Sequence, residues 1–199
     1  MTGPRGGAAR ERILDAASTA FYREGIRAVG VDAVVASAGV AKATLYRHFP
    51  SKDALVDAFL ERRDVRWREW LEGAVERLAP APADRPLAVF DALGEWFASD
   101  DFRGCAFINA AAEIADPAHP AREAVRAHKR LLGGYLERLV REAGADDAAA
   151  AAAAPALLLL AEGSIVTALI EGDAAPALRA RDAAARLLSG VVPSPREGP

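Results

Sequence analysis

Apolar residues recur at helical spacing along most of the chain, and turn-forming residues divide it into short segments. Near the N-terminus Ile13, Leu14, Ala17 and Phe21 fall on one side of a helix, and Gly25 follows as a stop signal. Strand signals are scarce, whereas alanine, leucine, glutamate and arginine dominate. The pattern predicts an all-α protein of about nine helices. The expected helices span about residues 8–24, 31–38, 42–48, 51–78, 87–99, 102–115, 121–143, 147–171 and 176–189.

The segment 30–52 has the pattern of a helix-turn-helix. Its two short helices are separated by the turn Ala38-Gly39-Val40, and a third helix begins at Ser51, a favourable N-cap residue. In this motif the second helix enters the major groove of DNA. That helix is rich in basic and hydroxyl side chains, while Leu45 and Phe49 are expected in the core. The candidate DNA-binding residues are Lys42, Thr44, Tyr46, Arg47, His48 and Lys52.

These side chains suit DNA in different ways. Arg47 can donate two parallel hydrogen bonds to a guanine or bind a phosphate, and the sequence leaves both open. Lys42 likewise suits a base edge or the backbone, and the hydroxyls of Thr44 and Tyr46 more often position a protein on phosphates. His48 either donates to a phosphate or packs as a neutral ring. Lys52 joins the positive end of a helix dipole, where a phosphate can bind.

Charge is distributed unevenly along the chain. Residues 1–52 contain eight lysines and arginines against four acids, a net charge of +4, although the whole chain has −3. A basic N-terminal part on an acidic body fits a DNA-reading domain joined to another domain. We therefore predict a DNA-binding head, residues 1–52, joined to a body that does not bind DNA, residues 53–199. The long fourth helix should join them without a flexible linker.

Several other classes of protein are disfavoured. No uninterrupted apolar run reaches the roughly 18–20 residues that span a bilayer, and no export signal is visible, so we expect no membrane partner. The single cysteine, Cys105, suits a reducing cytoplasm and is more readily read as a buried apolar residue than as a redox sensor. Three histidines and no zinc-type spacing, glycine-rich loop or nucleophile elbow give no basis for a metal, a cofactor or an enzyme.

The motif AGVAKATLYRHFPSKDAL, residues 38–55, resembles that of the TetR/AcrR family of bacterial transcriptional regulators. The resemblance implies a homodimer that binds a palindromic operator in double-stranded DNA, usually as a repressor released by a small molecule. This chain departs from the family pattern in two places. Ala41 stands where a Ser or Thr often caps the recognition helix, and Gly30-Val31 stand where a Thr is frequent. Both changes remove hydroxyls that cap helices or bind phosphate.

The body supplies candidates for an effector site and a dimer interface. Aromatic residues with a few polar groups are typical of small-molecule sites, although aromatic stripes are more often core. The last two helices are expected to form a four-helix bundle with the same two helices of a second subunit. The candidate effector residues are Trp70, Phe90, Trp96, Phe97, Phe107, Asn109, Glu113, His128, Tyr135 and Glu162. The candidate interface residues are Leu157, Leu160, Ser164, Thr167, Ala168, Leu178, Ala184 and Leu187.

The alternative function is an architectural protein that binds DNA without sequence preference. Such proteins usually spread positive charge widely, whereas here it is confined to the short head. Equal affinity for operator and random DNA would favour this alternative. A helical enzyme is much less favoured than either.

Overall fold

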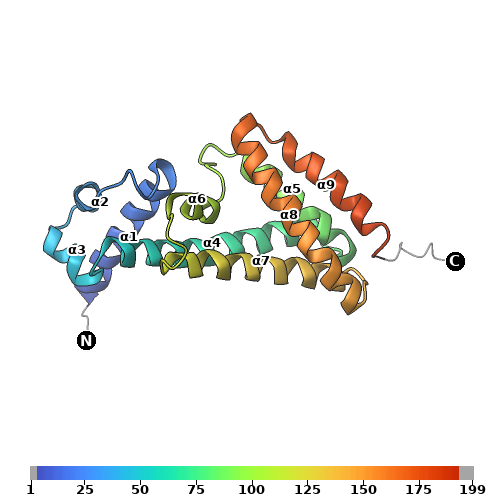
Figure 1. Ribbon diagram of the computed structural model, residues 1–199, viewed down its shortest axis with the longest axis horizontal. Helices are drawn as coiled ribbons and strands as arrows, with labels where there is room; N and C mark the ends of the chain where they lie inside the picture. Colours follow the sequence, from blue (N-terminus) through green and yellow to red (C-terminus); the bar gives the residue numbers. More distant parts are fainter. Residues whose placement is uncertain (1–3, 193–199) are drawn as a thin grey trace. The chain divides into compact units, whose positions relative to one another are not determined.

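The structure, a computed structural model, describes residues 4–192, with side chains from Gly7 onward (Figure 1). The described residues form nine α-helices, one short 3-10 helix and no strand, which confirms the predicted all-α fold. The α-helices are α1 (Pro4–Glu24), α2 (Val31–Ala38), α3 (Lys42–His48), α4 (Lys52–Leu78), α5 (Arg85–Phe97), α6 (Ala106–Glu113), α7 (Ala121–Glu142), α8 (Asp147–Glu171) and α9 (Ala175–Leu188), and the 3-10 helix η1 is Pro82–Asp84.

Two helix starts differ from the sequence prediction. Helix α6 was expected from residue 102 but begins at Ala106, because Gly104 has a φ of 78° and this left-handed conformation cannot continue a right-handed helix. Helix α1 begins at Pro4 instead of about residue 8, since proline is well suited to a first helical position. At α4 the predicted cap is confirmed, as the Ala54 amide donates to Ser51 Oγ at 3.0 Å.

The chain packs as two compact units. Unit 1 contains the chain up to Arg66 together with Ala106–His128, and unit 2 contains Trp67–Cys105 and the chain from Lys129 onward. The division falls inside helices α4 and α7, each of which therefore contributes to both units. It separates packing units, and the functional boundary predicted after residue 52 stays a prediction.

Unit 1 is built around the apolar side of α1. Ile13, Leu14, Ala17 and Phe21 are all buried, as their spacing predicted, and the Phe21 ring meets Phe59 of α4 edge to face at 5.7 Å. Leu45 of α3 and Val34 of α2 are also buried, which fixes both short helices to this core. A second buried cluster lies between α4, α6 and α7 within the same unit. There His128 Nδ1 lies 2.7 Å from Asp64 Oδ1 and its ring stacks on Phe107 at 3.7 Å.

In unit 2, helices α5, α8 and α9 pack against one another, and their facing residues are small or apolar. All three tryptophans of the chain lie in an aromatic cluster of this unit. Trp96 meets Trp67 at 5.7 Å, Trp70 at 6.1 Å and Phe102 at 5.0 Å between ring centroids. Cys105 is buried, as expected of an apolar core residue. The unit thus combines a close-packed alanine-rich region with one aromatic cluster.

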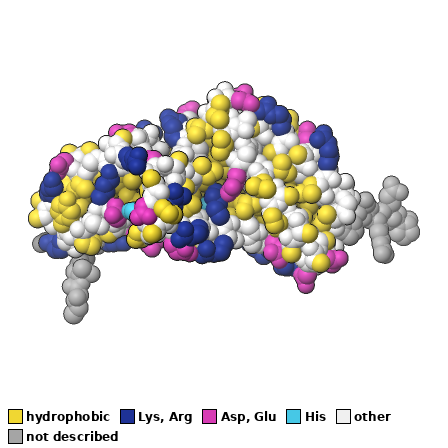
Figure 2. All heavy atoms as spheres, in the orientation of Figure 1, with side chains coloured by type: hydrophobic (Ala, Val, Ile, Leu, Met, Phe, Trp, Pro, Cys, Tyr) yellow, Lys and Arg dark blue, Asp and Glu magenta, His cyan; other side chains and the backbone are white. Residues whose placement is uncertain are grey.

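Helix α8 is apolar on its outer side as well as its inner side. Its length and mean hydropathy of 1.9 would allow it to cross a membrane, although 39% of that apolar window is buried within the protein. Glu162 interrupts the apolar sequence of this helix, which is why no uninterrupted run of spanning length was expected there. Figure 2 shows apolar side chains gathered in patches over the part of unit 2 that contains α8 and α9. Exposed apolar patches of this kind are typical of protein interaction surfaces.

Candidate nucleic-acid interface

The turn between α2 and α3 has a fixed geometry. Gly39 adopts a left-handed conformation, with a φ of 60° and a ψ of 43°. Its amide donates to the Ala36 carbonyl and the Val40 amide donates to the Val35 carbonyl, both at 3.3 Å. These two bonds form a Schellman motif, which satisfies the last carbonyls of α2 and sets the direction in which the chain leaves it. The turn therefore positions α3 relative to α2.

Replacing Gly39 by alanine is expected to lower the free energy of unfolding by about 1–2 kcal/mol, the cost of a left-handed backbone for a residue with a Cβ. No atom lies within 4 Å of the position an added Cβ would take, so the loss would come from strain and not from a clash. Gly39→Asn should lose less, because asparagine tolerates this conformation better. Urea unfolding of the three proteins checks this, and equal losses for both variants would contradict it.

Helix α3 presents one side to solvent and buries the other. Leu45 is fully buried beneath it, and Phe49, directly after it, is also buried. Lys42, Tyr46 and Arg47 are exposed, and Thr44 is half-buried. The structure therefore places the basic side chains and the tyrosine on the open side of a helix that is held from below, as base or phosphate contacts require.

The start of α3 lacks a side-chain cap. Ala41 occupies the N-cap position in extended conformation, and only backbone atoms bond there, with the Thr44 amide donating to the Ala41 carbonyl at 2.8 Å. Gly30 caps α2 in the same way, without a side-chain bond. The two departures from the family pattern thus coincide with helix starts that have no side-chain cap among the described residues. The first turn of α3 also has no acidic residue, so this helix start favours anions.

Two of the candidate residues have particular surroundings. Lys42 Nζ lies 2.7 Å from Asp32 Oδ1 on α2, so this ammonium is already paired within the protein. His48 is half-buried, and its Nε2 is enclosed without a hydrogen-bond partner among the described residues. A phosphate contact through that nitrogen requires the ring to turn, so the structure favours the packing role for His48. Lys52 is half-buried at the first position of α4.

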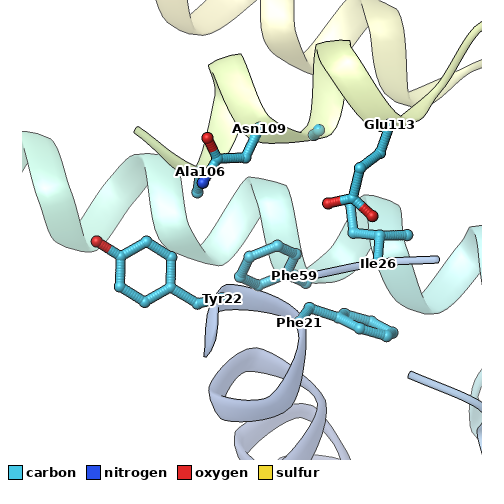
Figure 3. Close-up of a pocket in the computed structure, with 8 residues that line it drawn as sticks. Phe21, Tyr22, Ile26, Phe59, Ala106, Asn109 and Glu113 are labelled. Atoms are coloured by element: carbon cyan, nitrogen blue, oxygen red, sulfur yellow. The ribbon is translucent and has the colours of Figure 1, made fainter. Parts of the chain in front are cut away.

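Helix α6 is linked to the loop after α1 by a carboxylate. Figure 3 shows Glu113 pointing from α6 toward Ile26, and its Oε2 accepts a hydrogen bond from the Arg27 amide at 2.7 Å. Gly25 has a φ of 95°, and a Cβ there would lie 3.2 Å from both carboxylate oxygens. The link joins residues 86 positions apart in the sequence, so no local pattern could have revealed it.

The cavity beside this link is too small for an effector. It is lined from α1, α4 and α6 (Figure 3), and its volume of about 10 Å³ has room for one water molecule at most. Asn109 and Glu113, both candidate effector residues, line this cavity. In the structure Glu113 is occupied in holding two parts of unit 1 together.

The candidate effector residues are divided between the two units. In unit 2, burial raises the pKa of Tyr135 to about 12, so the phenol stays neutral and can donate a hydrogen bond, while Glu162 pairs with Lys129 at 2.8 Å. Phe90 and Phe107 are fully buried and serve as core. Phe107, Asn109, Glu113 and His128 belong to unit 1, and Trp70, Phe90, Trp96, Phe97, Tyr135 and Glu162 belong to unit 2.

An open groove between α7 and α8 was not predicted. Its volume is about 460 Å³, within the range of small-molecule sites, and its floor is largely apolar. Gly133 and Gly134 leave space on α7 that larger residues would fill, and this pair was the sequence signal that could have indicated a groove. The lining residues are Lys129, Arg130, Gly133, Gly134, Glu137, Ala151, Ala154, Pro155 and Leu158.

The structure also divides the candidate interface residues. Leu157, Ser164, Ala168 and Ala184 are buried within the monomer, whereas Leu178 is 61% exposed. Leu160, Thr167 and Leu187 are half-buried. Four large apolar residues on the outer side of α8 were not among the candidates, because both sides of this helix are apolar and the sequence does not show which side faces inward. These are Leu159, Val166, Leu169 and Ile170.

Comparison with known proteins agrees with this geometry. Residues 13–59 match the sequence profile described as bacterial regulatory proteins, tetR family, and residues 82–184 match the profile described as tetracyclin repressor-like, C-terminal domain. The chain is 28% identical to the HTH-type transcriptional regulator LmrA of Bacillus subtilis over 175 residues, which cover 86% of this chain and 92% of LmrA.

Solved structures of similar proteins share the whole fold. A TetR-family transcriptional regulator from Streptomyces coelicolor is 35% identical, with a TM-score of 0.83 over 93% of this chain and 96% of that one. A tetR transcriptional regulator from Streptomyces avermitilis is 31% identical, with a TM-score of 0.76 over 92% of this chain and 97% of that one. With a helix-turn-helix in unit 1 and both profiles matched, the chain is a DNA-binding transcriptional regulator and not an enzyme, and it belongs to the TetR family.

Proposed function

We propose that this protein is a cytoplasmic repressor that binds a palindromic operator as a homodimer and is released by a small molecule. The observation that carries the proposal is helix α3, whose open side presents Lys42, Tyr46 and Arg47 while Leu45 anchors it from below. A rigid helix with exposed basic side chains reads the major groove at low entropic cost.

Dimerisation is supported by the outer side of α8. Leu159, Val166 and Ile170 follow one another at helical spacing and are 70%, 40% and 79% exposed. We call these three residues, together with Leu178 of α9, which is 61% exposed, the α8 stripe. A stripe of this kind in a water-soluble regulator is stabilised when a second copy covers it. Two heads then meet successive major grooves, about 34 Å apart.

Release by an effector is supported by the way the chain divides into units. Residues 106–128 lie in the sequence of the predicted ligand-binding body, yet they pack in unit 1 with the helix-turn-helix. Glu113 bonds the backbone directly after α1, so a displacement of α6 would disturb the loop that precedes α2. Unit 2 offers the α7–α8 groove as a place for a largely apolar ligand. The ligand has to prefer the conformation that does not bind DNA.

Arg47→Ala is expected to weaken operator binding by about 1–3 kcal/mol if Arg47 reads a base. The measurement is a titration of wild type and variant on the DNA upstream of its own gene and on scrambled DNA, at fixed moderate salt. Arg23→Ala, which removes an exposed arginine of α1, is the matched control for loss of one positive charge. Equal, salt-sensitive binding to both DNAs would indicate an architectural protein, and an unchanged affinity would remove Arg47 from the interface.

A further inference from the structure

The two helices of the helix-turn-helix are joined by an ion pair on their solvent side. Lys42 Nζ, at the start of α3, lies 2.7 Å from Oδ1 of Asp32, in the first turn of α2. Both side chains are largely exposed, 54% for Lys42 and 79% for Asp32, so DNA can reach them. The hydrogen bond to Asp32 and then its negative charge raise the pKa of Lys42, so the pairing strengthens the ammonium form that lysine already has at neutral pH.

Asp32 has two opposite electrostatic effects at its position. A carboxylate in a first turn stabilises its own helix through the dipole, but it also puts negative charge beside the helix that is presented to DNA. Backbone phosphates are repelled by that charge, and nonspecific binding depends almost wholly on phosphates. A carboxylate paired with Lys42 thus lowers the contribution of this lysine to the affinity for nonspecific DNA.

An ammonium has three donors in a flexible position, and Asp32 occupies one of them. The other two stay available for acceptors on a base edge, such as guanine O6 and N7. Because one hydrogen bond already restrains the side chain, less rotamer freedom is lost when Lys42 meets a base. The same restraint works against a phosphate, which must approach the carboxylate to reach the lysine.

We propose that Asp32 is a specificity-determining residue of this regulator, which holds Lys42 for a base edge and withholds it from backbone phosphates. Asp32 itself does not contact DNA in this proposal. It acts on specificity by positioning Lys42. The inference rests on the proposed operator binding and adds to it a reason for an acidic residue in a basic head. It makes the ratio of operator affinity to nonspecific affinity depend on a residue outside the recognition helix.

The test compares wild type with Asp32→Asn on two duplexes: an operator selected from random DNA by the wild-type protein, and a scrambled duplex. For the variant we expect about two- to fivefold tighter binding to scrambled DNA. This fold-change corresponds to the free energy that an exposed ion pair usually contributes. The slope of log affinity against log salt on that DNA should steepen by about 0.9, one additional phosphate contact. Affinity for the operator should rise less or fall, so the specificity ratio decreases.

Glu24→Gln is the matched control, because it removes one exposed acid of the head outside the helix-turn-helix. In a Lys42→Met background, Asp32→Asn should lose most of its effect on the specificity ratio, and only the direct repulsion between the carboxylate and phosphates should remain to be relieved. Thermal unfolding of each variant shows that the fold is retained. The proposal is overturned if Asp32→Asn matches Glu24→Gln in slope and ratio, or if operator and scrambled DNA gain equally. Failure of the selection to enrich any sequence would instead overturn specific operator binding itself.

Discussion

Val166→Glu is expected to convert the proposed dimer to a monomer and to weaken operator binding by a factor on the order of 10²–10⁴, the usual gain from linking two binding sites. Val166 lies near the middle of the α8 stripe, with Leu159 two turns before it and Ile170 one turn after it. In an interface the new carboxylate would lose its water without gaining a cation, at a cost of several kcal/mol. Glutamate has a higher helix propensity than valine, so the substitution should not destabilise helix α8 itself.

Sedimentation of both proteins over a range of concentrations measures the change in assembly, and a titration on operator DNA measures its effect on binding. Leu131→Glu is the matched control, because Leu131 on α7 is also large, apolar and 48% exposed. It should leave the dimer intact. If Val166→Glu remains dimeric, the α8 stripe is not the interface. If Leu131→Glu dissociates the dimer as well, the interface extends over α7.

Local sequence signals were sufficient for most of the helical boundaries. Gly39 and Gly172 end α2 and α8 in left-handed conformations, and Asp146 caps α8 by accepting from the Ala149 amide, so glycine and cap residues mark these ends directly. The start of α6 was predicted too early because Gly104 has a positive φ. Glycine adopts positive and negative φ about equally readily, so the sequence does not show which one occurs.

The candidate DNA-binding residues could be named from the sequence because the helix-turn-helix motif is local, and the structure leaves three of the six exposed. Their contacts with DNA stay a prediction. For the candidate interface and effector residues, burial and hydrogen-bond partners depend on tertiary contacts. Leu157 and Leu159 stand two positions apart in a run of leucines, yet the first is fully buried and the second 70% exposed. Only the packing of α5 and α9 against α8 decides between them. The same holds for Glu113, whose partner lies 86 positions away.

Arg62 illustrates another long-range contact that no local pattern indicates. Its guanidinium, on α4, donates to the Leu14 carbonyl at 2.5 Å, to Ser18 Oγ at 2.6 Å and to Asp15 Oδ1 at 2.8 Å. The side chain is only 13% exposed, and all three acceptors belong to α1. Hydrogen bonds from a charged donor at a partly buried site contribute more than ordinary ones. Arg62 therefore fastens α1 to α4 within unit 1.

Arg62→Met is expected to lower the free energy of unfolding by about 1.5–3 kcal/mol, the worth of hydrogen bonds to a charged group. Methionine retains much of the apolar stem, and the Leu14 carbonyl still accepts from Ser18 Oγ at 2.6 Å, so the loss isolates the guanidinium. Arg63→Met is the matched control, since the neighbouring guanidinium stacks on the Tyr22 ring at 4.1 Å and should cost about 0.5–1 kcal/mol. Urea unfolding gives both values, and hydrogen exchange should show faster opening of α1 in Arg62→Met alone. Equal losses in the two variants would mean that the contacts of Arg62 with α1 do not secure the helix.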